Sequence, residues 1–270
     1  GVKVMLIKLY KILYRSLVSY ASIAGVDESA LQKYFIPEGN TSSESILFRL
    51  CSSLQNSGMM RNSIKFNDKD TTHRDIVKKV LFSFDAKKSA AIYSDWASIY
   101  NAMLAGGITD NGIKNKKESN WEKYCRGLYD GIRFLSAGNG DKTIKELVTA
   151  SELTDKELKD IYAISNQIHG LGLPLTCDWL KECGCTCLAK PEAHINGVVK
   201  HLYANEKLKD EDVLKLMFSW AETVKSSGED IGATAYKIDK IIWLLCTGEF
   251  YLDDRRVGRE AIYRRIDALS

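Results

Sequence analysis

The chain has 270 residues, enough for one large hydrophobic core or two smaller ones, and a formal net charge of +3, too mild to indicate nucleic-acid binding from bulk charge. No apolar stretch reaches the roughly 20 uninterrupted residues that span a bilayer, so we expect no membrane partner. Only three prolines interrupt the chain, and apolar residues recur mainly at intervals of three and four. The composition therefore predicts an all-α fold.

Helix-start signals and glycine breaks divide the chain into elements. The sequences TSSE at 41–44 and TDKE at 154–157 have the spacing of a capping box, in which a hydroxyl and a carboxylate bind each other's exposed amides. The clearest break in the apolar period is 105–120. Its lysines Lys114, Lys116 and Lys117 either contact phosphate or lie in a solvated linker. The predicted helices span 3–23, 27–35, 43–57, 71–83, 88–104, 119–136, 142–151, 155–169, 174–183, 192–203, 209–226, 231–247 and 255–268.

The cysteines indicate a reducing compartment. Seven cysteines, an odd number in a chain of this length, are typical of free thiols rather than of a disulfide framework. We therefore expect an intracellular protein, in the cytoplasm, nucleoid or nucleus. Cys183, Cys185 and Cys187 alternate without the paired two-residue gaps of zinc sites, so we expect no metal there.

The sequence IHGLGLPLTCDWLKECG, residues 168–184, predicts a helix, a tight turn and a second helix. The chain turns through Gly170, Leu171 and Gly172, and Pro174 lies in the first turn of the next helix, where its missing N–H does no harm. Two glycines permit positive φ and the close approach of a ligand. The outward amides of the second helix favour an anion such as a phosphodiester, although a plain αα-hairpin would have the same pattern.

A carboxylate follows this turn at a fixed distance. Glu192 lies 22 positions after Gly170 and two before His194. At these residues the sequence resembles the helix-hairpin-helix DNA glycosylase superfamily, in which a G-x-G hairpin, a helix and a D-x-H motif share this spacing. The resemblance is specific over 167–201 and looser over 235–251, and it matches Gly170, Gly172, Glu192 and His194 to the family's positions.

The resemblance implies that the chain hydrolyses the N-glycosidic bond of a modified or damaged base flipped out of DNA, leaving an abasic site, with Glu192 as the catalytic acid. One carboxylate suffices, because it stabilises positive charge on the sugar and can also orient or deprotonate water. Pro174 occupies the position of the Schiff-base lysine of strand-cleaving members, so we expect no lyase activity through it. Glu192 replaces the family's aspartate. A shift of about 1 Å can cost about 100-fold in rate, so either the cleft is rebuilt around the longer acid or activity is impaired.

Two further sets of residues are expected to meet DNA. The strand should contact Gly170, Leu171, Gly172, Leu173, Lys190 and His194, with His194 in a positioning role. The candidates for a pocket that receives the flipped base are Trp121, Tyr124, Tyr236, Asp239 and Trp243. Aromatic residues at helical spacing are more often core residues, and Asp239 could cap, pair with a lysine or line the cleft.

The resemblance also implies the domain organisation. A lobe of residues 86–191 would carry the hairpin, residues 1–85 and 192–270 would form a second helical lobe, and the cleft would lie between them. We expect DNA as the partner, no obligate protein partner and no cofactor, with a monovalent cation at the hairpin possible. The alternatives are a non-catalytic DNA-binding relative, in which Glu192 only caps a helix, and a helical RNA-binding or scaffold protein.

Overall fold

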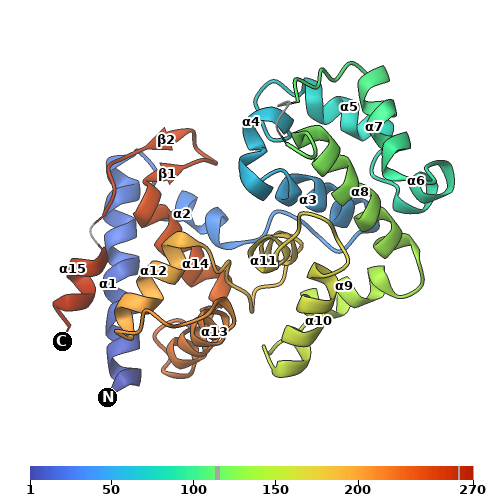
Figure 1. Ribbon diagram of the computed structural model, residues 1–270. Helices are drawn as coiled ribbons and strands as arrows, with labels where there is room; N and C mark the ends of the chain where they lie inside the picture. The colour runs from blue at the N-terminus through green and yellow to red at the C-terminus, as the bar shows by residue number, and fades with distance from the viewer. Residues whose placement is uncertain (113–115, 261, 270) are drawn as a thin grey trace. The chain divides into compact units, whose positions relative to one another are not determined.

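The computed structural model of the chain describes residues 1–112, 116–260 and 262–269. Over these residues it is all-α apart from one two-stranded antiparallel ladder, which confirms the predicted fold class (Figure 1). The chain forms two compact units. Unit 1 comprises Gly1–Pro37, Ala150–Thr154 and Cys185–Ser270, and unit 2 comprises Glu38–Thr149 and Asp155–Gly184.

Unit 1 is built on a long amphipathic helix. Its elements are α1 (Val2–Ile23), α2 (Glu28–Leu31), the 3-10 helix η1 (Gln32–Phe35), α12 (Ala193–Leu202), α13 (Asp210–Ser226), α14 (Ala235–Thr247), β1 (Glu249–Phe250), β2 (Arg255–Arg256) and α15 (Ile262–Asp267). Leu6, Leu9, Leu13 and Leu17 recur at helical spacing on α1 and are buried. This stripe faces α13 and α14, so segments far apart in sequence share one core.

Unit 2 is organised around α8 (Figure 1). Its elements are α3 (Ser43–Leu54), the 3-10 turn η2 (Ser57–Met59), α4 (Arg61–Ile64), α5 (Thr72–Val80), α6 (Ala86–Ile92), α7 (Trp96–Ala105), α8 (Asn120–Ser136), α9 (Gly140–Val148), α10 (Asp155–Ser165) and α11 (Leu173–Glu182). A capping box between Ser119 and Glu122 begins α8, which packs against α3, α6 and α7. The hairpin turn, residues 166–172, connects α10 to α11 in this unit.

The division differs from the expected lobes, because residues 38–85 belong to the unit that carries the hairpin turn. The physical reason is the packing of α3 on α8. A Cβ on Gly127 would lie 2.6 Å from Leu54 Cδ2, and a Cβ on Gly131 would lie 2.2 Å from Leu50 Cδ2. Glycine at both positions therefore lets the leucines of α3 reach the backbone of α8. Residues 185–191, expected with the hairpin, belong to unit 1.

Most predicted helices are present, with three corrections. The helix predicted at 88–104 is two helices, α6 and α7, because Asp95 caps a new start by accepting a bond from Ser98 N–H at 2.8 Å. The helix predicted to end at 83 ends at Val80, since residues 82–84 all have positive φ. At 255–268, Arg255 and Arg256 pair with β1, and only α15 is helical.

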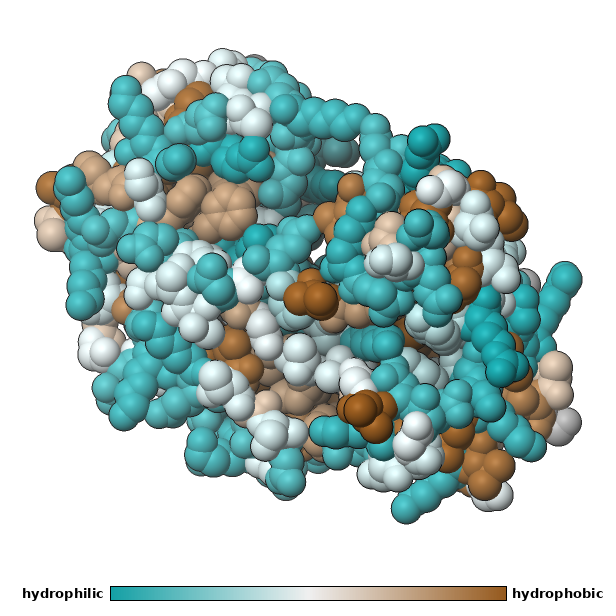
Figure 2. Space-filling model, turned by 180° about the vertical axis from the view of Figure 1, so that it is seen from behind, coloured by the Kyte–Doolittle hydropathy of each residue, from teal (hydrophilic) through white to brown (hydrophobic). Residues whose placement is uncertain are grey.

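Exposed hydrophobic residues are scattered over the surface of the described residues. Figure 2 shows one face on which hydrophobic side chains lie as small separate areas among hydrophilic ones. Met59 in unit 2 is the most exposed of the large hydrophobic side chains, at 88%. None of the helices in the described part of the chain is both long and apolar enough to cross a membrane.

Candidate active site

The hairpin turn is closed by its own hydrogen bonds. Leu171 N–H donates to the Ile168 carbonyl at 3.1 Å, and the Ser165 hydroxyl donates to the Leu171 carbonyl at 2.8 Å. The Leu171 side chain is buried, so it anchors the turn. Gly170 has φ +77°, a left-handed conformation that strongly favours glycine. Two helices joined by a tight turn at Gly170 are therefore present, although α10 ends at Ser165 and not at the predicted 169.

Gly172 does not use the positive φ that glycine permits. Its φ is −75° and its ψ 178°, an extended conformation open to any residue. Gly172 is the exposed N-cap of α11, and no side chain caps this helix. A Cβ there would meet only Pro174 Cδ, at 3.8 Å. The first-turn amides of Leu173 and Leu175 have no carbonyl within the helix to receive them, which leaves α11 with an anion-binding start.

The turn is fixed to α8. His169 N–H donates to Asp130 Oδ2 at 2.9 Å, and His169 Nε2 lies 2.9 Å from Glu118 Oε1. Glu118 also pairs with Arg126, at 3.1 Å. Gly127 allows the close approach, because a Cβ there would lie 2.7 Å from the His169 carbonyl oxygen. These contacts hold the turn in one position within unit 2.

In unit 1, Glu192 is the N-cap of α12. Its carboxylate accepts bonds from His194 N–H and Ile195 N–H, both at 3.2 Å. The side chain is half-buried, and the preceding Pro191 is buried. A carboxylate has about four acceptor sites, so the two amide bonds orient Glu192 without using its whole capacity.

Helix α14 supports the segment that leads to Glu192. Asp239, 3% exposed, accepts a bond from Lys190 N–H at 2.6 Å through Oδ2. Cys246, seven residues later on the same face of α14, is near Glu192: burial, together with the Glu192 charge, raises the pKa of the Cys246 thiol to about 11. Asp239 therefore acts on the backbone two residues before the acid, a role that the sequence did not indicate.

Two tyrosines of unit 1, the candidate Tyr236 and Tyr251, lie next to the buried Lys240. Lys240 Nζ donates to the Tyr251 hydroxyl at 2.8 Å and lies 5.5 Å from the centre of the Tyr236 ring and 5.2 Å from that of Tyr251. Tyr236 is 2% exposed, whereas Tyr251 is 48% exposed and meets the half-buried Trp243 edge to face at 5.6 Å. Trp243 and Tyr251 therefore form the solvent-facing aromatic surface of this group. Lys240 and Tyr251 were not among the predicted site residues, because neither belongs to a motif or a regular spacing in the sequence.

The aromatic candidates of unit 2 have separate roles. Tyr124 is fully buried and donates to the Cys51 carbonyl at 2.7 Å, so it is a core residue, the alternative that its spacing left open. Trp121 is also buried, but it lies against His73 at 5.6 Å and borders a cavity of about 520 Å³. The sequence indicated no role for His73.

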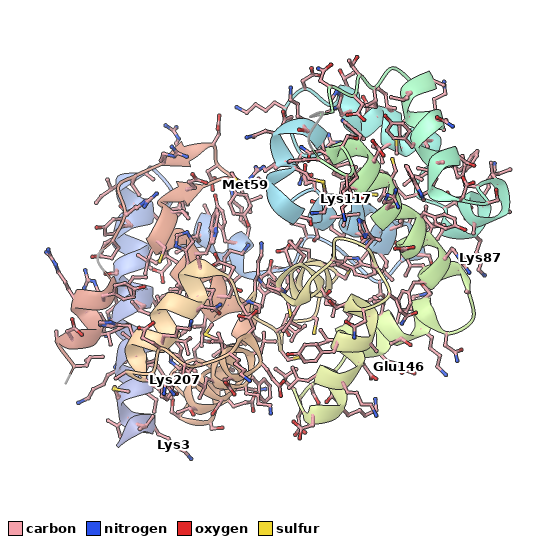
Figure 3. All side chains as sticks on the ribbon, viewed as in Figure 1. Lys3, Met59, Lys87, Lys117, Glu146 and Lys207 are labelled. Atoms are coloured by element: carbon pink, nitrogen blue, oxygen red, sulfur yellow. The ribbon has the colours of Figure 1, made fainter. Side chains whose placement is uncertain are left out.

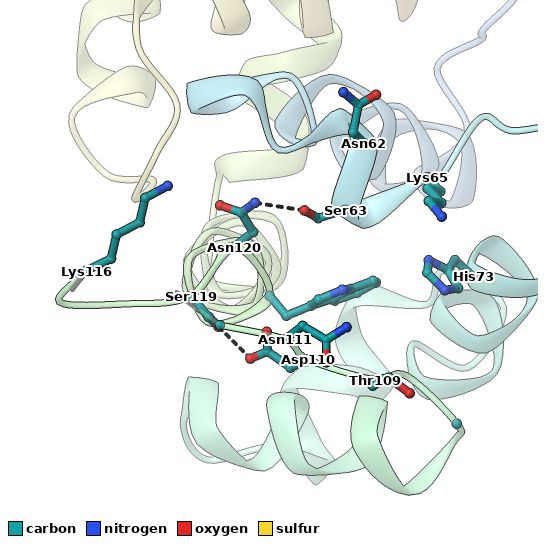
Figure 4. A pocket seen from close by; sticks show the side chains of 13 residues that line it. Asn62, Ser63, Lys65, His73, Thr109, Asp110, Asn111, Lys116, Ser119 and Asn120 are labelled. Atoms are coloured by element: carbon teal, nitrogen blue, oxygen red, sulfur yellow. Dashed lines mark hydrogen bonds between the residues drawn. The ribbon is translucent and has the colours of Figure 1, made fainter. Parts of the chain in front are cut away.

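This cavity has a polar lining (Figure 4). Asn120 Nδ2 donates to Ser63 Oγ at 2.8 Å on one side, and Ser119 Oγ donates to Asp110 Oδ2 at 2.5 Å on the other. Lys116, one of the loop lysines, borders it, whereas Lys114 lies outside the described residues.

The described residues offer little to a metal ion. They contain no group of three or more His, Cys, Asp or Glu side chains that could hold one. None of the seven cysteines, all within the described residues, forms a disulfide, and the sulfur atoms of Cys185 and Cys187 lie 3.5 Å apart. At the hairpin turn, the carbonyls of Ile168 and Leu171 already accept hydrogen bonds. A monovalent cation at this turn stays a prediction.

Comparisons with known proteins do not by themselves show what this chain does. No family model and no curated protein matches the chain. Among solved structures, the 8-oxoguanine DNA glycosylase of Thermotoga maritima aligns with 89% of this chain and 98% of its own, at 13% sequence identity and a TM-score of 0.47. Similarity at this level does not identify an activity.

Proposed function

We propose that the chain is a monofunctional DNA glycosylase, which hydrolyses the bond between deoxyribose and a modified or damaged base flipped out of DNA. The observation that carries this proposal is the state of Glu192. Its carboxylate is oriented by two amides at the start of α12, and the backbone before it is held by the buried Asp239. Such a fixed carboxylate suits the stabilisation of a sugar cation.

Glu192 has two tasks in this reaction. As the bond to the base lengthens, positive charge develops on the sugar, and the carboxylate beneath the ring stabilises it. The same carboxylate then orients or deprotonates the attacking water. Its remaining acceptor sites are available for both tasks, since the amides of His194 and Ile195 use only two.

The hairpin turn holds the DNA strand. The exposed start of α11 offers amides and a helix dipole to a phosphate, and Gly172 presents no side chain that would obstruct it. Such contacts position the strand without reading its sequence.

Exposed apolar side chains in both units suit base flipping. Trp243 and Tyr251 offer a surface on which an extruded base can stack. Met59 projects from a turn with φ +64° and is labelled in Figure 3. An apolar side chain of this kind can enter a base step and replace the lost stacking.

The activity is tested with duplexes that each carry one modified base. Incubation followed by heating in alkali converts abasic sites into strand breaks. We expect excision by the wild type, loss by about 100-fold or more in Glu192→Gln, and retention in Pro174→Ala. The matched control is Asp85→Asn, which removes a similar capping carboxylate at α6 and should leave excision unchanged. Borohydride should trap no covalent adduct at residue 174.

Glu192→Asp separates the two explanations of the longer acid. If the surroundings of residue 192 are built for glutamate, the shorter side chain should lower the excision rate, by about 100-fold for a displacement of about 1 Å. If glutamate at position 192 impairs the activity, Glu192→Asp should raise the excision rate.

The second candidate function, a non-catalytic DNA-binding protein, is favoured by the capping role of Glu192. Both of its oxygens accept amide bonds, as they would in a purely structural cap. Intact DNA binding with no excision from any substrate would support this function and refute the enzyme.

A further inference from the structure

Lys123 in the first turns of α8 lies between two glycine turns of unit 2. Its Cε is 3.3 Å from the place that a Cβ on Gly170 would take, and its Nζ is 2.9 Å from the corresponding place on Gly58. Both glycines have positive φ, +77° and +54°. The aliphatic part of Lys123 therefore lies along the hairpin turn, and its ammonium group lies over the turn that carries Met59.

The ammonium group of Lys123 lacks a partner among the residues that the structure describes, although the side chain is half-buried. The nearest carboxylates in sequence are engaged elsewhere. Glu122 closes the capping box of α8, and Glu118 binds Arg126 and His169. A half-buried cation with no partner among these residues is available to an anion from outside the chain.

We infer that Lys123 binds a backbone phosphate of the DNA strand, adjacent to the phosphate held at the start of α11. This inference rests on the proposed function. The Lys123 ammonium would add a positive charge to a phosphate-binding surface that otherwise consists of the uncharged amides of α11. It would hold the strand against Gly170 and beside Met59. Lys123 is thus a positioning residue, and the two glycines keep its ammonium group accessible.

The test is the salt dependence of binding to a fluorescent duplex, measured by anisotropy at several NaCl concentrations. Lys123→Gln should flatten the slope of log K against log salt by about 0.9, which corresponds to about eightfold weaker binding at 0.1 M salt. Lys123→Arg should retain the slope. The matched control is Lys142→Gln, which removes an exposed lysine of α9 and should leave both slope and affinity unchanged.

Gly58 provides a second test of the same contact. A Cβ in Gly58→Ala would displace the Lys123 ammonium, so this variant should lose a similar part of the slope, and it should lose no more when combined with Lys123→Gln. Thermal unfolding of each variant separates these effects from loss of fold. An unchanged slope in Lys123→Gln, in a wild type that binds and excises, would refute this inference alone. A wild type that does not bind DNA would refute the proposed function as well.

Discussion

The two glycines of the hairpin turn give a prediction in which one substitution tests the fold and the other tests binding. Gly170→Ala forces alanine to φ +77°, where left-handed backbone costs about 1–2 kcal/mol. Its Cβ would also approach Lys123 Cε at 3.3 Å and Ser57 Oγ at 3.4 Å. Gly172→Ala, in contrast, adds a methyl group to an extended residue, with Pro174 Cδ 3.8 Å away. Only the first substitution should strain the folded state.

The magnitude follows from the comparison of the two variants. Each replaces glycine by alanine, so each restricts the unfolded chain similarly, and that effect cancels in the difference between them. The remaining strain of about 1–2 kcal/mol corresponds to a difference in Tm of about 2–8 °C, since 1 kcal/mol shifts Tm by about 2–4 °C in chains near this size. Differential scanning calorimetry measures it directly.

DNA binding should give the opposite order. Gly172→Ala should unfold no lower than the wild type yet weaken duplex binding, because its methyl group lies where a phosphate would approach the α11 amides. Equal Tm values for the two variants would refute the assignment of strain to Gly170. Undiminished binding by Gly172→Ala would remove the hairpin turn from the proposed interface.

Three further predictions concern unit 1 and the exposed methionine. Alkylation of Cys246 at pH 8, followed by mass spectrometry, should be about 100-fold slower than that of an unperturbed thiol, because the pKa of Cys246 is raised from 9.0 to about 11. The reactive thiolate forms only as the pH approaches that value. Glu192→Gln should accelerate the alkylation of Cys246, because it removes the nearby negative charge. Asp239→Ala should lower the free energy of unfolding by about 1–3 kcal/mol in urea, since it leaves the part-buried Lys190 amide without its acceptor. An unchanged excision rate in this variant would argue against a supporting role for Asp239. Met59→Ala should leave Tm unchanged, because the side chain is 88% exposed, but lower excision; equal rates would exclude it from base flipping.

The features that local sequence determines were predicted well. Gly170 marks the tight turn and Pro174 the first turn of the next helix, and both signals act within a few residues. Asp95 is an equally local signal: an aspartate N-cap followed by Ser98 three residues later predicts the helix start that divides 88–104.

The supporting contacts could not be predicted, because they join segments far apart in sequence. Asp239 binds an amide 49 residues away, and Lys123 lies against a glycine 47 residues later. Helical periodicity identifies the face that a residue occupies but not the element that the face meets. The same limit explains why residues 38–85 were expected outside the unit that carries the hairpin turn. The sequence contains the glycines of α8 and the leucines of α3, but it does not indicate that they pack against each other.

The packing of α1 has a consequence for synthesis in the cell. The leucine stripe of Val2–Ile23 is covered by α13 and α14, which begin at Asp210 and Ala235. A ribosome adding about 5–20 residues per second needs roughly 10–40 s to make the intervening stretch of about 190 residues. During that time Leu6, Leu9, Leu13 and Leu17 lack their native cover, so this helix exposes an apolar face to chaperones and to other nascent chains.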